Sequence, residues 1–136
     1  MAVSDPKRSG AQRLHSPIVL VAANVDLSDL LNGALADTDV ALLHAQSKQE
    51  VIAVLERVKS RFDLAIIDLE LPDFDGWDLI GRLTQPPRRV VKTIAATFIY
   101  SESLAKQIIA LGVDIVTSRA MAIEEWRKIV ETALLG

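Results

Sequence analysis

Five short apolar runs, each followed by a segment with helical periodicity, are the strongest constraint on how this 136-residue chain folds. The runs cover residues 18–22, 40–43, 64–67, 93–96 and 113–116. Nearly continuous apolar strands that alternate with helices are typical of a parallel sheet covered by helices on both faces. We therefore predict an α/β fold with a doubly wound, five-stranded parallel sheet.

The segments between the runs carry recognisable helix signals. Asp26 is predicted to cap the first helix, and Ser47 with Glu50 forms a capping-box pattern before the second. Trp77, Ile80 and Leu83 are predicted to face the core from the third helix. The fourth helix covers about 103–111, with Leu104, Ile108 and Leu111 buried, and Gly112 ends it. A last helix over 123–134 closes the chain.

Composition bounds the remaining possibilities. The length fits one domain, and we interpret residues 1–16, which contain no apolar signal-peptide core, as a flexible leader before the domain at 17–136. The net charge of −3 and the lack of a basic stripe argue against nucleic-acid binding through this domain. The apolar runs are too short to span a membrane. The absence of cysteine fits a cytoplasmic protein.

Candidate functional residues follow the strands, because open parallel sheets bind their ligands beyond the carboxyl ends of the strands. In chain order these residues are Ala22, Ala23 and Asn24, then Asp68 and Glu70, then Thr97, and finally Ser118 and Arg119. An ionised carboxylate at the position of Asp68 is costly unless it is paired, metal-bound or solvated, although a loop cap would also explain it. Thr97 or Arg119 alone would be unremarkable, so their convergence carries the prediction.

The segment "DLAIIDLELPDFDGWDLI" resembles the response-regulator receiver domains of bacterial two-component signalling. It matches the family pattern D-x-x-x-x-D-x-x-(L/M)-P-x-x-(D/N)-G at Asp63, Asp68, Leu71, Pro72, Asp75 and Gly76. The segment "ALGVDIVTSRAM" resembles the family's last strand, and the similarity covers about residues 16–135. The resemblance implies the flavodoxin-like receiver fold with strand order 2-1-3-4-5.

By position, the resemblance implies that Asp68 is the phosphoacceptor and Thr97 the switch hydroxyl. Arg119 stands where the family has its phosphate-binding lysine, and a forked guanidinium still suits a phosphate or a carboxylate. Ala120 replaces the proline that follows this lysine in the family. Val116 stands where an aromatic residue often reports the active state.

Ala22 and Ala23 are the largest departure, since they occupy the positions of the acidic pair that holds Mg²⁺ with the phosphoacceptor. Asp68, a backbone carbonyl and Glu70 are then the remaining candidate ligands, with a solvated loop acid as the alternative for Glu70. We therefore expect Mg²⁺ binding to be weak or absent. Without metal, Arg119 and Asp68 are expected to form a direct charge-assisted pair.

Three functions follow from these residues. The first is an atypical, non-enzymatic receiver in a phosphorelay, with Asp68 as phosphoacceptor and weakened Mg²⁺-dependent phosphorylation by a histidine kinase. The second is a phosphorylation-independent pseudo-receiver that binds another signalling protein, or a second copy, through the face made by the helix at 103–111, the strand at 113–116 and the helix at 123–134. The third is a haloacid-dehalogenase-type phosphatase, which would need an aspartate at the position of Glu70.

Overall fold

The computed structural model describes residues 16–71 and 75–135, so residues 1–15 of the predicted leader and Pro72 lie outside the described part. Five parallel strands form one sheet in the order β2-β1-β3-β4-β5. The strands are β1 (Ile18–Ala22), β2 (Ala41–Ala45), β3 (Phe62–Asp68), β4 (Val90–Thr97) and β5 (Ile115–Ser118). This order confirms the predicted doubly wound sheet.

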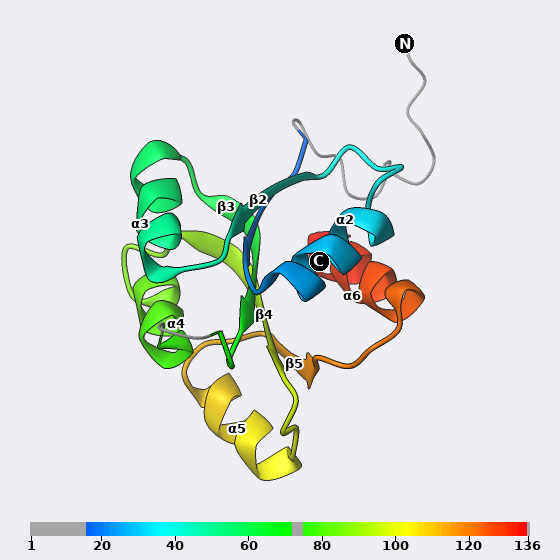
Figure 1. Cartoon of the computed structure of the whole chain (residues 1–136). Coiled ribbons are helices and arrows are strands. Elements are labelled where there is room, and N and C mark those ends of the chain that lie inside the picture. The colour runs from blue at the N-terminus through cyan, green and yellow to red at the C-terminus, as the bar shows by residue number, and fades with distance from the viewer. Residues whose placement is uncertain (1–15, 72–74, 136) are drawn as a thin grey trace.

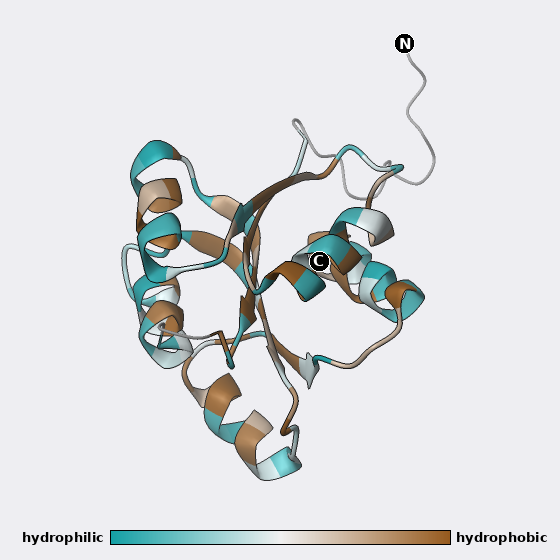
Figure 2. Cartoon of the chain, viewed as in Figure 1, coloured by the Kyte–Doolittle hydropathy of each residue, from teal (hydrophilic) through white to brown (hydrophobic). Residues whose placement is uncertain are grey.

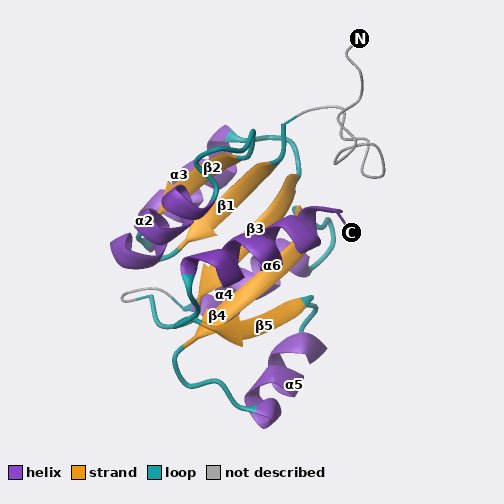
Figure 3. Ribbon diagram, turned by 90° about the vertical axis from the view of Figure 1, so that its right-hand side faces the viewer, coloured by secondary structure: helices purple, strands orange, loops and turns teal. Residues whose placement is uncertain are grey.

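Helices cover both faces of the sheet (Figures 1 and 3). On one face lie α2 (Val25–Ala34) and α6 (Ile123–Leu135), and on the other lie α3 (Lys48–Arg57), α4 (Gly76–Thr84) and α5 (Glu102–Ala110). Hydrophobic and hydrophilic residues alternate along these helices (Figure 2), and each helix contributes residues to the hydrophobic clusters that cover the sheet. The sheet is therefore buried from both sides, as its continuous apolar strands predict.

Two hydrophobic clusters, one on each side of the sheet, form the core. Trp126 and Leu31 pack from α6 and α2 against one face, and Phe62 and Leu20 belong to the cluster on the other. All four side chains are fully buried. At about 25 cal/mol per Å² of apolar surface removed from water, these two clusters supply the main driving force for folding. Among the described residues, no helix is both long enough and apolar enough to cross a membrane.

Three local predictions are wrong. Asn24, not Asp26, caps α2, because its side-chain oxygen accepts the backbone N–H of Leu27 at 3.1 Å. Trp77 lies on the exposed side of α4, while Leu79 joins Ile80 and Leu83 in the core. Leu111 comes after the last turn of α5, where its side chain is exposed rather than buried. All three errors concern helix ends, where the periodic pattern is least informative.

Other local signals are confirmed. Ser47 caps α3 by accepting the N–H of Glu50, and the Glu50 carboxylate reaches back to the N–H of Gln46 at 2.7 Å. Gly112 follows α5 with a φ of 107°, a conformation that favours glycine. β1 has the predicted bounds, whereas the other strands are longer than their apolar runs or shifted: β5 covers Ile115–Ser118 instead of 113–116.

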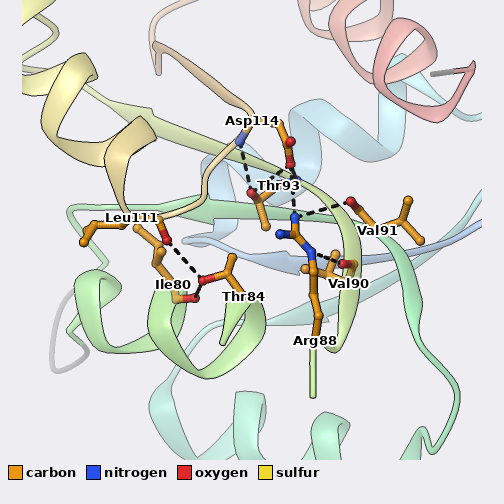
Figure 4. Close-up of polar contacts among 8 residues, drawn as sticks. All are labelled: Ile80, Thr84, Arg88, Val90, Val91, Thr93, Leu111 and Asp114. Carbon is orange, nitrogen blue, oxygen red and sulfur yellow. Dashed lines mark hydrogen bonds and ion pairs between the residues drawn. The ribbon is translucent and has the colours of Figure 1, made fainter. Parts of the chain in front are cut away.

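A polar network joins β4 to the segment before β5 at the edge of the sheet opposite the candidate site (Figure 4). Asp114 Oδ2 accepts hydrogen bonds from the backbone N–H and the hydroxyl of Thr93, at 2.9 and 3.3 Å, and from Arg88 Nη2 at 3.3 Å. Thr84 Oγ1 lies beside it and donates to the carbonyl groups of Ile80 and Leu111. These bonds fix the start of β5 and therefore the position of the residues at its other end.

Candidate functional site

The strand register brings the predicted site residues to one edge of the sheet. Asp68 is paired in register with Ala96, and Thr97 with Ser118. Ala22 is paired with Ile67, so that Ala23 and Asp68 follow the last register pair of their strands. The backbone N–H of Arg119 donates to the carbonyl of Thr97 at 2.9 Å, which brings Arg119 to the same edge.

Asp68 is a fully buried carboxylate at the end of β3. Its Oδ1 accepts the backbone N–H of Glu70 at 3.0 Å. Its Oδ2 lies 3.2 Å from Arg119 Nη1, and no described residue donates a well-aligned hydrogen bond to this oxygen. Burial raises the pKa of Asp68, while the N–H groups of Glu70 and Asn24 and the charge of Arg119 act in the opposite direction.

Arg119 is the counter-charge of Asp68. Only 8% of its side chain is exposed, which is unusual for an arginine. Its guanidinium carbon lies 4.5 Å from the ring centroid of Phe98, within the range of a cation–π contact. The guanidinium is therefore placed between a buried carboxylate and an aromatic ring.

Ala22 and Ala23 have no exposed surface and pack into opposite sides of the core. Ala22 belongs to the cluster of Phe62, and Ala23 to the cluster of Trp126. The next residue, Asn24, uses its side-chain oxygen to cap α2. The two alanines at the end of β1 are thus core residues and supply no carboxylate to the site.

Glu70 joins the loop after β3 to the end of β4. Its Oε2 accepts a hydrogen bond of 2.5 Å from the hydroxyl of Thr97, and its Oε1 accepts the backbone N–H of Phe98 at 3.0 Å. The Thr97 hydroxyl in turn accepts the N–H of Ile99 at 3.1 Å. Sequence reasoning places Glu70 and Thr97 at one edge but misses this bond and the Phe98 amide, because a backbone donor leaves no mark in side-chain identities.

The donor set around Asp68 does not fit the usual requirements of Mg²⁺. The ion prefers near-octahedral coordination by oxygen and takes one or two carboxylates besides water and substrate. Both oxygens of Glu70 accept hydrogen bonds, and the Arg119 guanidinium lies on Oδ2 of Asp68. Across residues 16–71 and 75–135, no three histidine, cysteine, aspartate or glutamate side chains are grouped so as to hold a metal ion.

Comparison with known proteins gives a consistent result. Residues 18–131 match the family model of the response regulator receiver domain. The signal receiver domain of a Vibrio parahaemolyticus protein superposes with a TM-score of 0.76 and 26% identity, over 89% of this chain and 91% of that one. A response regulator from Thermotoga maritima gives a TM-score of 0.74 and 18% identity, over 89% and 99% of the two chains, which supports the fold alone.

A curated relative from Leptolyngbya boryana, named an uncharacterized 14.6 kDa protein in the sodA1 3′ region, is 32% identical over 71 residues. The match covers 52% of this chain and 53% of that protein, so the chain spans about half the length of this relative.

Proposed function

Because this chain belongs to the response regulator receiver domain family, we propose that it is a receiver whose conformation is held by its own charged residues, with Mg²⁺-dependent phosphorylation of Asp68 weakened. Receiver domains are generally non-catalytic modules of two-component signalling that interact with histidine kinases or other signalling proteins, and they typically bind Mg²⁺. In our proposal residues 17–136 form the receiver unit, Asp68 is the phosphoacceptor position and Thr97 the switch hydroxyl.

The observation that carries this proposal is the pairing of the buried Asp68 with Arg119 beside two alanines. A carboxylate attacks a phosphodonor through a free oxygen, and the negative charge of the transferred group must be neutralised. Arg119 supplies one positive charge, but it also lies 3.2 Å from Oδ2 of the carboxylate that would attack. Ala22 and Ala23 remove the side chains that would hold the metal. Transfer to Asp68 is therefore slow in our account.

The same pairing favours signalling by protein contact without phosphorylation. A fixed Arg119–Asp68 pair holds one arrangement of the site, so a partner meets the same surface at all times. The surface we propose is formed by α5, β5 and α6, and it includes the exposed Ile109 of α5 and the exposed Leu111 that follows this helix. A partner on this surface would be another signalling protein or a second copy of the chain.

Intact mass after incubation with acetyl phosphate tests the weakened phosphorylation. The protein is treated with and without Mg²⁺, alongside Asp68→Ala, and the fraction carrying one added phosphoryl group is measured. We expect a small fraction in the unmodified protein, little effect of Mg²⁺, and none in Asp68→Ala. Near-complete, Mg²⁺-dependent labelling that Asp68→Ala abolishes would overturn the proposal. Ala22→Asp with Ala23→Asp should increase the Mg²⁺-dependent fraction.

The contact surface is tested by the molar mass in solution, measured by light scattering. If the chain associates through α5 and α6, Ile109→Lys lowers the mass toward that of a monomer. Ile52→Lys serves as the control, because Ile52 is exposed on α3. If the unmodified chain associates and neither variant lowers its molar mass, the interface lies elsewhere. If the unmodified chain is monomeric, self-association through this surface is rejected.

A further inference from the structure

The structure assigns Glu70 a positioning role: we propose that its carboxylate is a built-in anion that occupies the donors at the end of β4 and holds the loop at 98–101 in place of a phosphoryl group. This inference rests on the proposed function and deepens it, since it concerns how the same site is regulated. It concerns donors other than the Arg119 guanidinium, namely the Thr97 hydroxyl and the Phe98 amide.

The first step is that the Glu70 carboxylate accepts hydrogen bonds from both donors, the Thr97 hydroxyl and the Phe98 amide. The Thr97 hydroxyl has one proton, and its oxygen already accepts the N–H of Ile99 at 3.1 Å, which orients the group. The hydroxyl uses its one proton to donate a hydrogen bond to Glu70 Oε2, and the Phe98 amide donates to Glu70 Oε1. Neither donor can serve a phosphoryl oxygen on Asp68 while Glu70 stays bound.

The second step is that these two donors, which we call the cradle, are suited to an anion. A hydroxyl and a backbone N–H, one residue apart, each bind one oxygen of the same charged group, and hydrogen bonds to an ionised acceptor are the stronger kind. Glu70 enters this cradle from two residues beyond Asp68, and its own N–H donates to Asp68 Oδ1. The Glu70 carboxylate therefore binds at the end of β4. A phosphoryl group on Asp68 would have to reach the same donors.

The third step links the cradle to the protein surface. Phe98, Ile99 and Tyr100 follow Thr97 directly, and all three have large exposed apolar side chains. Two backbone N–H groups of this segment, those of Phe98 and Ile99, are fixed by Glu70 and Thr97. Phe98 also contacts the Arg119 guanidinium through its ring. The charge of Glu70 thus determines the conformation in which this apolar segment is exposed.

Amide hydrogen exchange of Phe98 and Ile99, measured by NMR, tests the role of Glu70. Glu70→Ala removes both acceptors, Glu70→Gln keeps one acceptor oxygen without the charge, and Glu56→Ala on α3 is a matched loss of an exposed charge. In Glu70→Ala we expect exchange of the Phe98 amide to be about five- to tenfold faster, because one hydrogen bond is lost. Glu70→Gln should be intermediate and Glu56→Ala unchanged. Unchanged exchange in Glu70→Ala would overturn the inference.

An added anion gives the second readout, which a merely structural role would not produce. With inorganic phosphate as the probe, the Phe98 amide resonance should shift saturably in Glu70→Ala and stay in place in the unmodified protein. A shift of equal size in both proteins, or in neither, would overturn the inference. Neither readout needs a phosphodonor, so this inference can fail while the weak labelling of Asp68 stands, and the reverse also holds.

Discussion

At the scale of single residues, the contact between Asp68 and Arg119 is the feature with the clearest energetic signature. A buried ion pair is not by itself strongly stabilising, because both groups lose their hydration, but removing one partner leaves an uncompensated buried charge. The pKa of Asp68 is raised, mainly by burial. The folded state then keeps a proton that the unfolded chain has already lost. The contribution of Asp68 to stability is therefore greatest below its ordinary pKa and declines as pH rises through the raised pKa.

Arg119→Met, which keeps the apolar stem and removes the charge, should lower the free energy of unfolding by about 2–4 kcal/mol at pH 7. The loss should shrink toward pH 4, because a protonated Asp68 needs no counter-charge. Loss of the guanidinium raises the pKa of Asp68 further, so the decline in stability extends to higher pH. Urea unfolding followed by the fluorescence of the buried Trp126, from pH 4 to 8, measures both effects.

The double variant Asp68→Asn with Arg119→Met is the control for this prediction. With no carboxylate at the site, the pH dependence assigned to Asp68 should disappear. A destabilisation by Arg119→Met that is equal at pH 4 and pH 7 would show that packing on Phe98, rather than charge, is what Arg119 contributes.

At the scale of elements, the end of α5 depends on a glycine. Gly112 has a φ of 107°, and an added Cβ would lie 3.3 Å from the Cβ of Thr84. Gly112→Ala should therefore destabilise the fold by about 1–2 kcal/mol. Gly81 is the matched control, because it lies within α4 and an added Cβ would have no heavy atom within 4 Å besides its chain neighbours and the nearby backbone of its own helix. Gly81→Ala should stabilise the fold by roughly 0.5–1 kcal/mol. Equal effects of both substitutions in thermal unfolding would contradict this account.

The start of β5 depends on Asp114 in the same way. Its Oδ2 accepts three hydrogen bonds, two of them from the buried Thr93. Asp114→Ala should cost about 1–3 kcal/mol, since it leaves the Thr93 amide without its acceptor. Asp114→Asn keeps an acceptor oxygen and should cost less. The difference is measured from the denaturant midpoints, provided that the slope of the unfolding free energy against denaturant concentration is unchanged. If Asp114→Asn destabilises the fold as much as Asp114→Ala does, the effect is due to charge alone.

Element order was within reach of the sequence, because a parallel sheet buried on both faces needs the apolar runs that this chain has. The strand order followed from the resemblance to receiver domains, not from the apolar runs. Features that depend on a single local contact could not be predicted from the sequence. Asn24 and Asp26 are both good caps, and only the backbone decides that Asn24 binds the Leu27 amide. Trp77 fits an apolar stripe by spacing, yet Leu79 fills the core instead. The acceptor role of Glu70 depends on a backbone amide, which a pattern of side chains does not contain.

At the scale of the whole molecule, the sheet brings to one edge a candidate site whose polar groups are bound by other groups of the chain. Asp68 is paired with Arg119, the hydroxyl of Thr97 is bound by Glu70, and the end of β1 carries alanine. Under the proposed function, we expect a metal or a phosphoryl group to have little differential affinity for two conformations of this site and so to shift its conformation little. The central claim is that the site is held by the chain's own side chains.

The most direct test is the NMR response of the unmodified protein to beryllium fluoride with Mg²⁺, a stable mimic of an acyl phosphate. The readouts are the backbone amides of Glu70, Phe98 and Arg119, with Asp68→Asn as the control that cannot form the adduct. We predict no saturable shift at these amides, with spectra that match those of Asp68→Asn under the same additions. Saturable shifts at all three amides, absent in Asp68→Asn, would contradict the claim and show a site that opens for its ligand.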